Sequence, residues 1–409
     1  MSVEQSSKTN DGKTLNVTSK KFVAMERIHT VLPKVDLDGQ SLNLLRQDEQ
    51  RYVAVKQLGE GAAGVVNLVQ DKDISRAVAM KTTKDQNSDI ALARFVEEVR
   101  TVGQLDHPNI IPIHDVGVSD NGEYFFTMKY IEGESLREII TKLQRGDKEY
   151  HAIYTFERRM AIFLEVLHAV NFAHDRGFIH RDIKPDNIMV GAYGEVVLMD
   201  WGIAKKIKDA HSSKLDKFLV SESSPSDRAQ PQRVFETEHG TLIGTPGYMA
   251  PEQVTGKIDA LDERTDIYSL SVMLYEFLTL NHYLRTLKPD LTSQLLGVLK
   301  HEPISPDKLS ISIQGKVPRE YYFIMKRGYQ KSPEKRFQSV QEMIVQVQRN
   351  LEGRIVISCP STFLKHFVFK YGRYLDSHRI FGVAFFVFIL ALLVMGVIQG
   401  VRWLSLLFS

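Results

Sequence analysis

The sequence predicts an α+β protein, with a small strand-rich lobe, a larger helical lobe and one C-terminal transmembrane helix. Three observations predict this. Strand-like apolar runs flank a glycine cluster between residues 52 and 71, helical apolar spacing dominates from residue 135 onward, and residues 381–401 are almost wholly apolar. The 409 residues are enough for two or three domains and a sizeable core.

The chain divides into five predicted parts. Residues 1–50 are expected to be a disordered polar arm without the apolar run of a signal peptide. Residues 51–352 are expected to be the folded domain, with a Ser-rich loop insertion at 208–236. The last three parts are a basic linker, the membrane helix and a short tail, at residues 353–380, 381–401 and 402–409.

Composition excludes two broad classes. The formal net charge of +2 gives no reason to expect binding to nucleic acid. The lone cysteine, Cys359, cannot form an internal disulfide, which fits a reducing compartment rather than a secreted scaffold.

The stretch LGEGAAGVV places Gly59, Gly61 and Gly64 in a G-x-G-x-x-G-x-V pattern. Glycine lets backbone amides approach phosphate oxygens, because no Cβ intervenes. A dinucleotide-binding loop shares the first six positions but requires a helix directly after the last glycine. Here VVNLV continues as a strand, so the pattern favours a hairpin that covers the phosphates of a nucleotide.

Lys81 lies among apolar residues in AVAMK, and Glu98 lies on the next predicted helix. A lysine at a strand end is usually only solvated. Glu98 can anchor this one, so that the ammonium is held over phosphates.

The stretch HRDIKPDN, residues 180–187, concentrates ionisable groups that core packing does not require. Phosphoryl transfer from ATP to a hydroxyl needs a carboxylate to orient the hydroxyl and accept its proton, which Asp182 can do. Lys184 can steady the moving phosphoryl group. Asn187 and Asp200 of DWG offer the oxygen ligands that a magnesium ion needs. Each residue alone could be an ordinary surface group.

Together these motifs resemble a eukaryotic-type (Hanks-type) serine/threonine protein kinase, of the bacterial membrane-anchored kind, over roughly residues 52–352. The resemblance implies the bilobal kinase fold, ATP with Mg²⁺ (or Mn²⁺) as cofactors and proteins with serine or threonine as substrates. It implies that Asp182, Lys184 and Asn187 are catalytic and that Asn187 and Asp200 hold the metal. The implied ATP-binding residues are Leu58, Gly59, Glu60, Gly61, Ala62, Ala63, Gly64, Val65, Val66, Ala79, Lys81, Glu98, Met128, Ile131 and Met189.

Further motifs carry the same resemblance. GTPGYMAPE is similar to the family's substrate-docking segment, and Glu252 in it is expected to pair with Arg336. Asp266 is expected to open a central helix under the catalytic loop, which is the segment HRDIKPDN at residues 180–187. Lys184 together with Thr245 is the serine/threonine variant of these motifs rather than the tyrosine variant.

Two departures from the family pattern delete no catalytic group. Trp201 stands where the family usually has Phe, and a large aromatic there still fills the space beside Val102, Ile113 and His180. Ala63 replaces a larger residue at the tip of the glycine loop.

Regulation is expected to involve Arg181, Thr237 and Thr241. In the family, an arginine before the catalytic aspartate is neutralised by a phosphate in the activation segment. Thr237 and Thr241 lie a few residues before Gly244, where that phosphate would be. We therefore expect autophosphorylation at one or both, with ordinary loop threonines as the alternative.

Residues 381–401 are long enough to cross a bilayer as a helix, and they lack the polar face that a buried core helix usually keeps. The excess of lysine and arginine before this segment predicts that residues 1–380 are cytoplasmic. Gly396 and Gly400 have the spacing of a helix-dimer contact, which permits a homodimer.

Two rival functions stay open. A catalytically silent pseudokinase at the membrane would keep the fold, but such proteins typically lose one of the catalytic groups that are all present here. A small-molecule kinase is disfavoured by GTPGYMAPE, which matches a segment that docks polypeptides.

Overall fold

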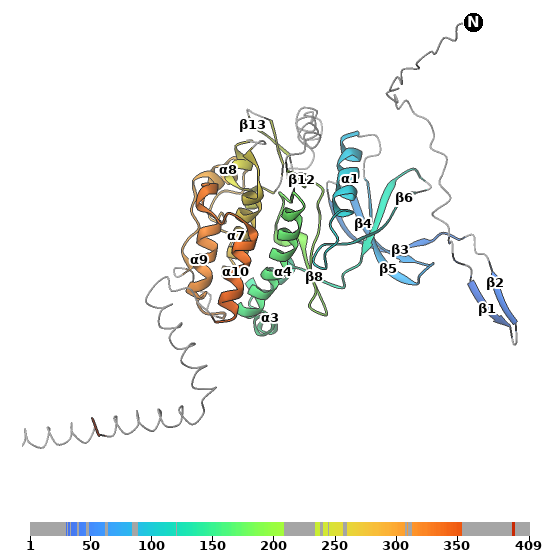
Figure 1. Ribbon diagram of the computed structural model, residues 1–409, viewed down its shortest axis with the longest axis horizontal. Coiled ribbons are helices and arrows are strands. Elements are labelled where there is room, and N and C mark those ends of the chain that lie inside the picture. The colour runs from blue at the N-terminus through green and yellow to red at the C-terminus, as the bar shows by residue number, and fades with distance from the viewer. Residues whose placement is uncertain are drawn as a thin grey trace, which may run out of the picture. The chain divides into compact units, whose positions relative to one another are not determined.

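The computed structural model (Figure 1) describes residues 30, 32, 34–38, 41–45, 49–61, 64–83, 89–119, 121–207, 234–237, 240–243, 245–256, 260–306, 309, 313–353 and 395–396. They belong to two compact units. The first runs to Ala91 and includes His114–Met128, and the second comprises Leu92–Ile113 and the residues from Lys129 onward. The first is strand-rich and the second mostly helical, which confirms the predicted α+β class.

A five-stranded sheet forms the centre of the first unit. Its order is β3-β4-β5-β7-β6. The strands are β3 (Tyr52–Gly61), β4 (Gly64–Asp71), β5 (Arg76–Thr82), β6 (Ile113–Val118) and β7 (Tyr124–Lys129). Side chains alternate between the two faces of a strand, and one face buries an apolar cluster. That cluster consists of Tyr52, Val69, Val78 and Phe125, with Met80 packed against it.

The glycine cluster lies at the turn of the β3–β4 hairpin, where Gly61 is opposite Gly64 in the antiparallel register. Gly64 has a φ of +154°, and a Cβ there would lie 2.1 Å from the carbonyl oxygen of Thr82 on β5. Only glycine allows this close approach. Because a strand and not a helix follows Gly64, the hairpin interpretation is confirmed over the dinucleotide-binding loop.

A second hairpin lies within the segment expected to be disordered. Strands β1 (Lys34–Asp38) and β2 (Ser41–Leu45) pair antiparallel, with Val35 opposite Leu44 and Leu37 opposite Leu42. The signal for it was an alternating apolar pattern on both sides of Asp38-Gly39, a common hairpin dipeptide. This short hairpin was missed because the polar composition of residues 1–50 outweighed its periodicity.

The second unit is mainly helical. Its helices are α1 (Asp89–Val102, which begins in the first unit), α2 (Leu136–Gln144), α3 (Lys148–Ile153), α4 (Phe156–Asp175), α6 (Pro251–Val254), α7 (Glu263–Thr279), α8 (Leu291–Lys300), α9 (Arg319–Gly328) and α10 (Val340–Leu351). Short strands make three small sheets, from β8 (Gly133–Ser135), β9 (Phe178–Ile179), β10 (Ile188–Gly191), β11 (Val196–Leu198), β12 (Lys205–Lys206), β13 (Val234–Thr237) and β14 (Gly240–Ile243).

Helix α7 is the core of this unit, because every residue from Thr265 to Thr279 is buried. Helices α4 and α9 pack against it, and α10 packs against both α4 and α9 (Figure 1). Local signals set the helix starts: Ser135, Thr155 and Ser339 each accept a hydrogen bond from a backbone N–H in the first turn.

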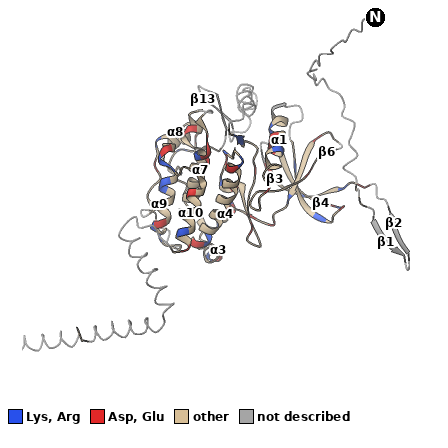
Figure 2. Cartoon of the chain, in the orientation of Figure 1, with Lys and Arg blue, Asp and Glu red and all other residues tan. Residues whose placement is uncertain are grey.

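Acidic and basic residues are interspersed along the outer helices α9 and α10 of the second unit (Figure 2). Within the part of the chain that the structure describes, no helix has the length and apolar character to cross a bilayer. The predicted membrane helix at 381–401 lies outside the described residues apart from Met395 and Gly396. The linker beyond Gly353, the tail and residues 208–233 of the insertion also lie outside them.

The contact between α7 and α9 makes a stability prediction. A Cβ on Gly328 would lie 1.8 Å from the Ser271 hydroxyl oxygen. We expect Gly328→Ala to lower the free energy of unfolding by about 1–3 kcal/mol in urea denaturation, because the helices must move apart. Adding Ser271→Gly should recover part of this loss. An equally destabilised double variant would show that overpacking is not the cause.

Candidate active site

The loop that links β9 to β10 carries HRDIKPDN, and the side chain of Asp266 binds its backbone. The carboxylate of this fully buried residue, in the first turn of α7, accepts the backbone N–H groups of His180 (2.8 Å) and Arg181 (2.9 Å). It also accepts His174 Nε2 at 2.8 Å. The prediction that Asp266 opens a central helix beneath this loop is confirmed.

Burial alone would raise the pKa of Asp266. The hydrogen bonds from the His174 side chain and the His180 backbone N–H lower it, so the pKa lies below its ordinary value. The carboxylate is therefore held in the charged form that accepts amide hydrogens. These bonds also hold Arg181 in a left-handed backbone conformation, with a φ of +66°. Such a conformation is costly for a non-glycine residue and is concentrated at functional sites.

Three polar side chains close a ring at the centre of the site. Asp182 Oδ2 lies 2.6 Å from Lys184 Nζ, and Asp182 Oδ1 accepts the hydroxyl and the backbone N–H of Thr245 at 2.8 and 3.0 Å. Lys184 Nζ also donates to the Thr245 hydroxyl at 2.8 Å. Asp182 and Lys184 are both buried. The structure thus brings together three residues that the sequence singled out.

Asn187 lies beside this ring, and Asp200 directly follows Met199, whose backbone N–H donates to Asn187 O at 2.8 Å. Asn187 donates through Nδ2 to the backbone oxygen of Asp182 at 2.8 Å, which leaves its Oδ1 as the atom for a cation. Asp200 has a φ of +59°. A Cβ built on Gly202 would lie 3.5 Å from Asp200 Oδ1 and 3.3 Å from Glu98 Oε2, so both carboxylates lie close to this glycine. No cluster of three or more His, Cys, Asp or Glu side chains suited to a metal occurs among the described residues. The oxygen set fits Mg²⁺ that takes its remaining ligands from phosphates.

The side chains of His180 and Trp201 form an aromatic contact, with ring centroids 4.5 Å apart. His180 Nδ1 accepts the backbone N–H of Asp182 at 3.3 Å, so Nε2 is the nitrogen that donates to Met199 O at 3.1 Å. Trp201 is 1% exposed. The tryptophan is therefore buried against His180, as predicted, and its predicted contacts with Val102 and Ile113 stay a prediction.

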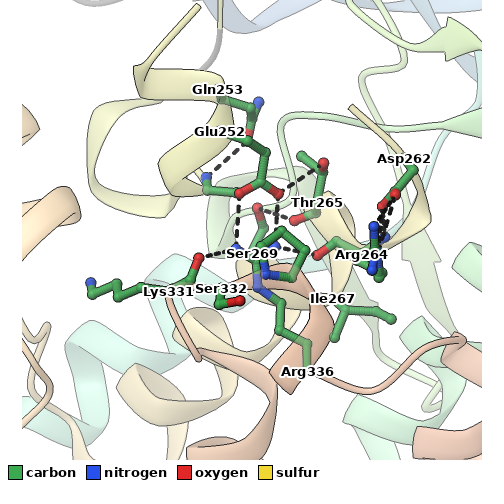
Figure 3. Close-up of polar contacts among 12 residues, drawn as sticks. Glu252, Gln253, Asp262, Arg264, Thr265, Ile267, Ser269, Lys331, Ser332 and Arg336 are labelled. Carbon is green, nitrogen blue, oxygen red and sulfur yellow. Dashed lines mark hydrogen bonds and ion pairs between the residues drawn. The ribbon is translucent and has the colours of Figure 1, made fainter. Parts of the chain in front are cut away.

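The buried ion pair between Glu252 and Arg336 was predicted and is confirmed (Figure 3). Arg336 Nη1 and Nη2 lie 2.7 and 2.8 Å from the two carboxylate oxygens. The remaining guanidinium hydrogens go to the backbone oxygens of Arg264, Gln330 and Lys331. All five N–H donors of Arg336 are thereby used, which compensates for removing the charge from water.

In the first unit, Val66, Ala79 and Lys81 share one sheet face. Val66 is opposite Lys81 in the β4–β5 register, and Ala79 is two positions from Lys81, so all three lie away from the apolar cluster. Lys81 is 8% exposed, with Nζ 5.9 Å from the ring centroid of Phe126. Phe126 and Met128 share a face of β7. The pairing of Lys81 with Glu98 stays a prediction.

The other predicted ATP-binding residues that the structure describes lie on β3, β4 and β10 and in the segment after β7. Leu58 is exposed on β3, whereas Ile131 is buried and Met189 on β10 is half-buried. The remaining glycine-loop residues Gly59, Glu60, Gly61, Val65 and Gly64 lie in the β3–β4 hairpin, and Ala62 and Ala63 lie outside the described residues.

The regulatory predictions are likewise untested. Arg181 is buried, and its Nε donates to Ile203 O at 2.5 Å. Thr237 is the last residue of β13 and Thr241 the second residue of β14, which pair with each other, but the side chains of both threonines lie outside the described residues.

Sequence reasoning missed two sets of contacts around the docking segment, defined here as residues 245–252. Gln253 Nε2 donates to Arg181 O at 2.9 Å and ties the segment to the catalytic loop. Tyr248 is bound by Arg137 and Glu276. Glu276 had a signal, because it is the one carboxylate in the apolar stretch YSLSVMLYEFLTL, and a buried carboxylate requires a partner. No sequence signal identified Arg137 as that partner.

Comparison with known proteins identifies this arrangement. The family model described as "Protein kinase domain" matches residues 52–347. The chain is 32% identical over 316 residues to the serine/threonine-protein kinase PknD of Chlamydia caviae. It is 33% identical over 313 residues to that of Chlamydia muridarum and 34% identical over 311 residues to that of Chlamydia trachomatis serovar D. These alignments cover 74% of this chain but only 31–32% of the relatives, so the chain matches about a third of their length.

The Glu252–Arg336 pair supports a stability prediction. Removing one partner of a buried ion pair leaves an uncompensated charge, so Arg336→Ala should lower the free energy of unfolding by about 3–5 kcal/mol. Arg100→Ala is the matched control, because the Arg100 side chain is 69% exposed and its Nη1 lies 3.8 Å from Glu97 Oε1. This variant should lower the free energy of unfolding by less than about 1 kcal/mol. Similar losses in chemical denaturation for the two variants would contradict the argument.

The depressed pKa of Asp266 predicts a pH dependence. A carboxylate with a lowered folded-state pKa stabilises the fold above its unfolded value of 3.8, and this contribution is lost as pH falls through the folded value. Asp266→Asn should therefore cost about 1–3 kcal/mol at pH 7, because the amide cannot accept all three hydrogen bonds. The difference from wild type should shrink below about pH 4 in denaturant titrations. A difference that stays constant down to pH 3 would refute this.

Proposed function

The chain belongs to the protein kinase family, in its Hanks-type serine/threonine branch, and from that premise we propose that it transfers the γ-phosphate of ATP to serine and threonine hydroxyls of proteins. The observation that carries the proposal is the ring of Asp182, Lys184 and Thr245. It combines a proton acceptor, a cation and a hydroxyl within hydrogen-bonding distance.

Asp182 is the proposed base. Its Oδ1 already accepts a hydroxyl, that of Thr245, so the carboxylate is oriented to accept an alcohol of the same kind from a substrate. A hydroxyl proton could pass to it as the oxygen attacks phosphorus. The backbone N–H of Asp182 is fixed by His180, and the loop beneath is fixed by Asp266, so the carboxylate is preorganised.

Lys184 is proposed to stabilise the charge of the transferring phosphoryl group. Its Nζ lies 2.6 Å from Asp182 Oδ2 and also donates to the Thr245 hydroxyl. An ammonium group has three hydrogens, and these two acceptors use two of them. A further hydrogen is therefore available for a phosphate oxygen. Such preorganised cations lower the barrier because they need no reorientation during the reaction.

ATP with Mg²⁺ is the proposed cofactor pair, with Mn²⁺ as an alternative metal. Asn187 Oδ1 and the Asp200 carboxylate would hold the metal, which would neutralise phosphate charge. On the first unit, Val66, Ala79 and Met128 offer apolar surface for adenine beside Lys81, whose ammonium suits phosphate.

We further propose that residues 381–401 tether the chain to a membrane, with the kinase domain cytoplasmic and the glycine pair permitting a homodimer. The support comes from the sequence alone: the apolar run, the excess of lysine and arginine before it, and the spacing of Gly396 and Gly400. The rival function, a pseudokinase, is countered by the presence of Lys81, Glu98, Asp182, Asn187 and Asp200.

The primary test is Mg-ATP phosphate incorporation into a generic protein substrate by the full chain in lipid. We expect Asp182→Asn to lower kcat by about 10²- to 10⁴-fold, because the proton acceptor is lost. Asp175→Asn, an exposed aspartate at the end of α4, serves as the control and should keep wild-type activity. A wild-type protein that labels nothing in lipid would favour the pseudokinase, and labelling of small molecules alone would favour a small-molecule kinase.

Autophosphorylation gives a second test. Mass spectrometry of wild-type protein after incubation with Mg-ATP should find phosphate on Thr237 or Thr241, and none on the Asp182→Asn protein. The Thr237→Ala/Thr241→Ala double variant should be several-fold less active, because its activation segment lacks the phosphate. Equal activity of the double variant would remove these threonines from regulation.

A further inference from the structure

One guanidinium joins three segments that are far apart in the sequence. Arg137, in the first turn of α2, donates through Nη1 to Glu276 Oε1 of α7 at 2.7 Å. Its Nη2 donates to the phenol oxygen of Tyr248, and its Nε lies 3.4 Å from Asp186 Oδ2 in the catalytic loop. Arg137 therefore contacts the loop that carries Asp182 and the docking segment at the same time.

Tyr248 completes a closed cycle of hydrogen bonds with these groups. Its phenol oxygen accepts from Arg137 and its hydrogen is donated to Glu276 Oε2, while Arg137 also donates to Glu276. Burial raises the pKa of Tyr248, and the charge of Glu276 adds to this, so the phenol keeps its proton. Each of the three groups uses the other two, and such a cycle has one preferred geometry.

The other side of the docking segment is held by His282. Its Nδ1 accepts the backbone N–H of Leu284 at 3.2 Å, so Nε2 carries the hydrogen that is donated to Gly247 O, also at 3.2 Å. The imidazole packs edge-on against the Tyr248 ring, with centroids 5.1 Å apart. A Cβ on Gly247 would lie 3.0 Å from that imidazole. Tyr248 is thus fixed by ring packing on one side and by hydrogen bonds at its hydroxyl.

Exposure shows what the guanidinium contributes. The Glu276 side chain is 4% exposed. Without Arg137, its buried charge would keep the neutral hydroxyl of Tyr248 as its one side-chain hydrogen-bond partner among the described residues. Asp186, by contrast, is 50% exposed. A lysine could neutralise Glu276, but one ammonium could not also span Tyr248 and Asp186 in the planar geometry of a guanidinium.

We propose that Arg137 is a positioning residue that sets the docking segment against the catalytic loop, and so controls binding of the polypeptide substrate rather than of ATP. This rests on the proposed kinase function. It acts through Tyr248 and Glu276 and touches no reacting atom.

The closing experiment combines hydrogen exchange with kinetics on the full chain. In Arg137→Ala, backbone amides of residues 247–250 should exchange at least about tenfold faster than in wild type, while those of α4 stay unchanged. The KM for an acceptor peptide should rise about tenfold and the KM for ATP should change by less than about twofold. Arg137→Lys should fall between wild type and Arg137→Ala in both measurements. Arg145→Ala, an exposed arginine at the end of α2, should match wild type.

Tyr248→Phe is the second variant, for use if Arg137→Ala fails to fold. It keeps the ring against His282 but removes both hydrogen bonds, and it should raise the peptide KM in the same way. Unchanged exchange at residues 247–250 in the folded variants would overturn the proposal, whether or not the wild type phosphorylates anything. Faster exchange with equal rises in both KM values would overturn the claim of substrate selectivity. A wild type without activity in lipid would instead refute the proposed function, and exchange alone would then decide whether Arg137 anchors the segment.

Discussion

Two backbone N–H groups of the catalytic loop, those of His180 and Arg181, donate hydrogen bonds to the carboxylate of Asp266, which has no exposed surface. The carboxylate is fixed to the start of α7, and α7 is the most deeply buried helix of its unit. Since Asp182 follows two residues after His180, its position is set by this contact. The strained backbone of Arg181 persists for the same reason, because the surrounding hydrogen bonds compensate for its cost.

Buried carboxylates with fixed partners also hold the docking segment, and here the partners are arginines. Glu252 is matched by Arg336 and Glu276 by Arg137, and each arginine comes from a segment distant in sequence from its carboxylate. Buried ion pairs of this kind contribute little net stability compared with apolar packing, but they tolerate few alternative geometries. In this protein they fix where the segment lies relative to the loop that carries Asp182 and Lys184.

The sequence predicted the parts of the site whose chemistry is local. Asp182 and Lys184 were identified from residue types and spacing, and Thr245 and the Glu252–Arg336 pair from family resemblance; Asp182, Lys184 and Thr245 are found in contact, and so are Glu252 and Arg336. The hairpin around Gly64 followed from the strand pattern after it. The contacts of Arg137 and Gln253 could not be predicted, because a polar residue on a helix carries no information about which distant group it meets. The β1–β2 hairpin was missed for a different reason, since a short alternating pattern is easily outweighed by polar composition.

The hydroxyl of Thr245 has a consequence for how acceptors compete. It donates to Asp182 Oδ1 at 2.8 Å, so the carboxylate is already served by an alcohol belonging to the chain itself. An intramolecular group of this kind has an effective concentration in the millimolar range or above. An acceptor serine or threonine therefore has to match an internal rival of the same chemical class, and surface contacts far from the hydroxyl must supply the difference. Under the proposed function, discrimination among substrates is thereby shifted from the reacting oxygen to the polypeptide around it.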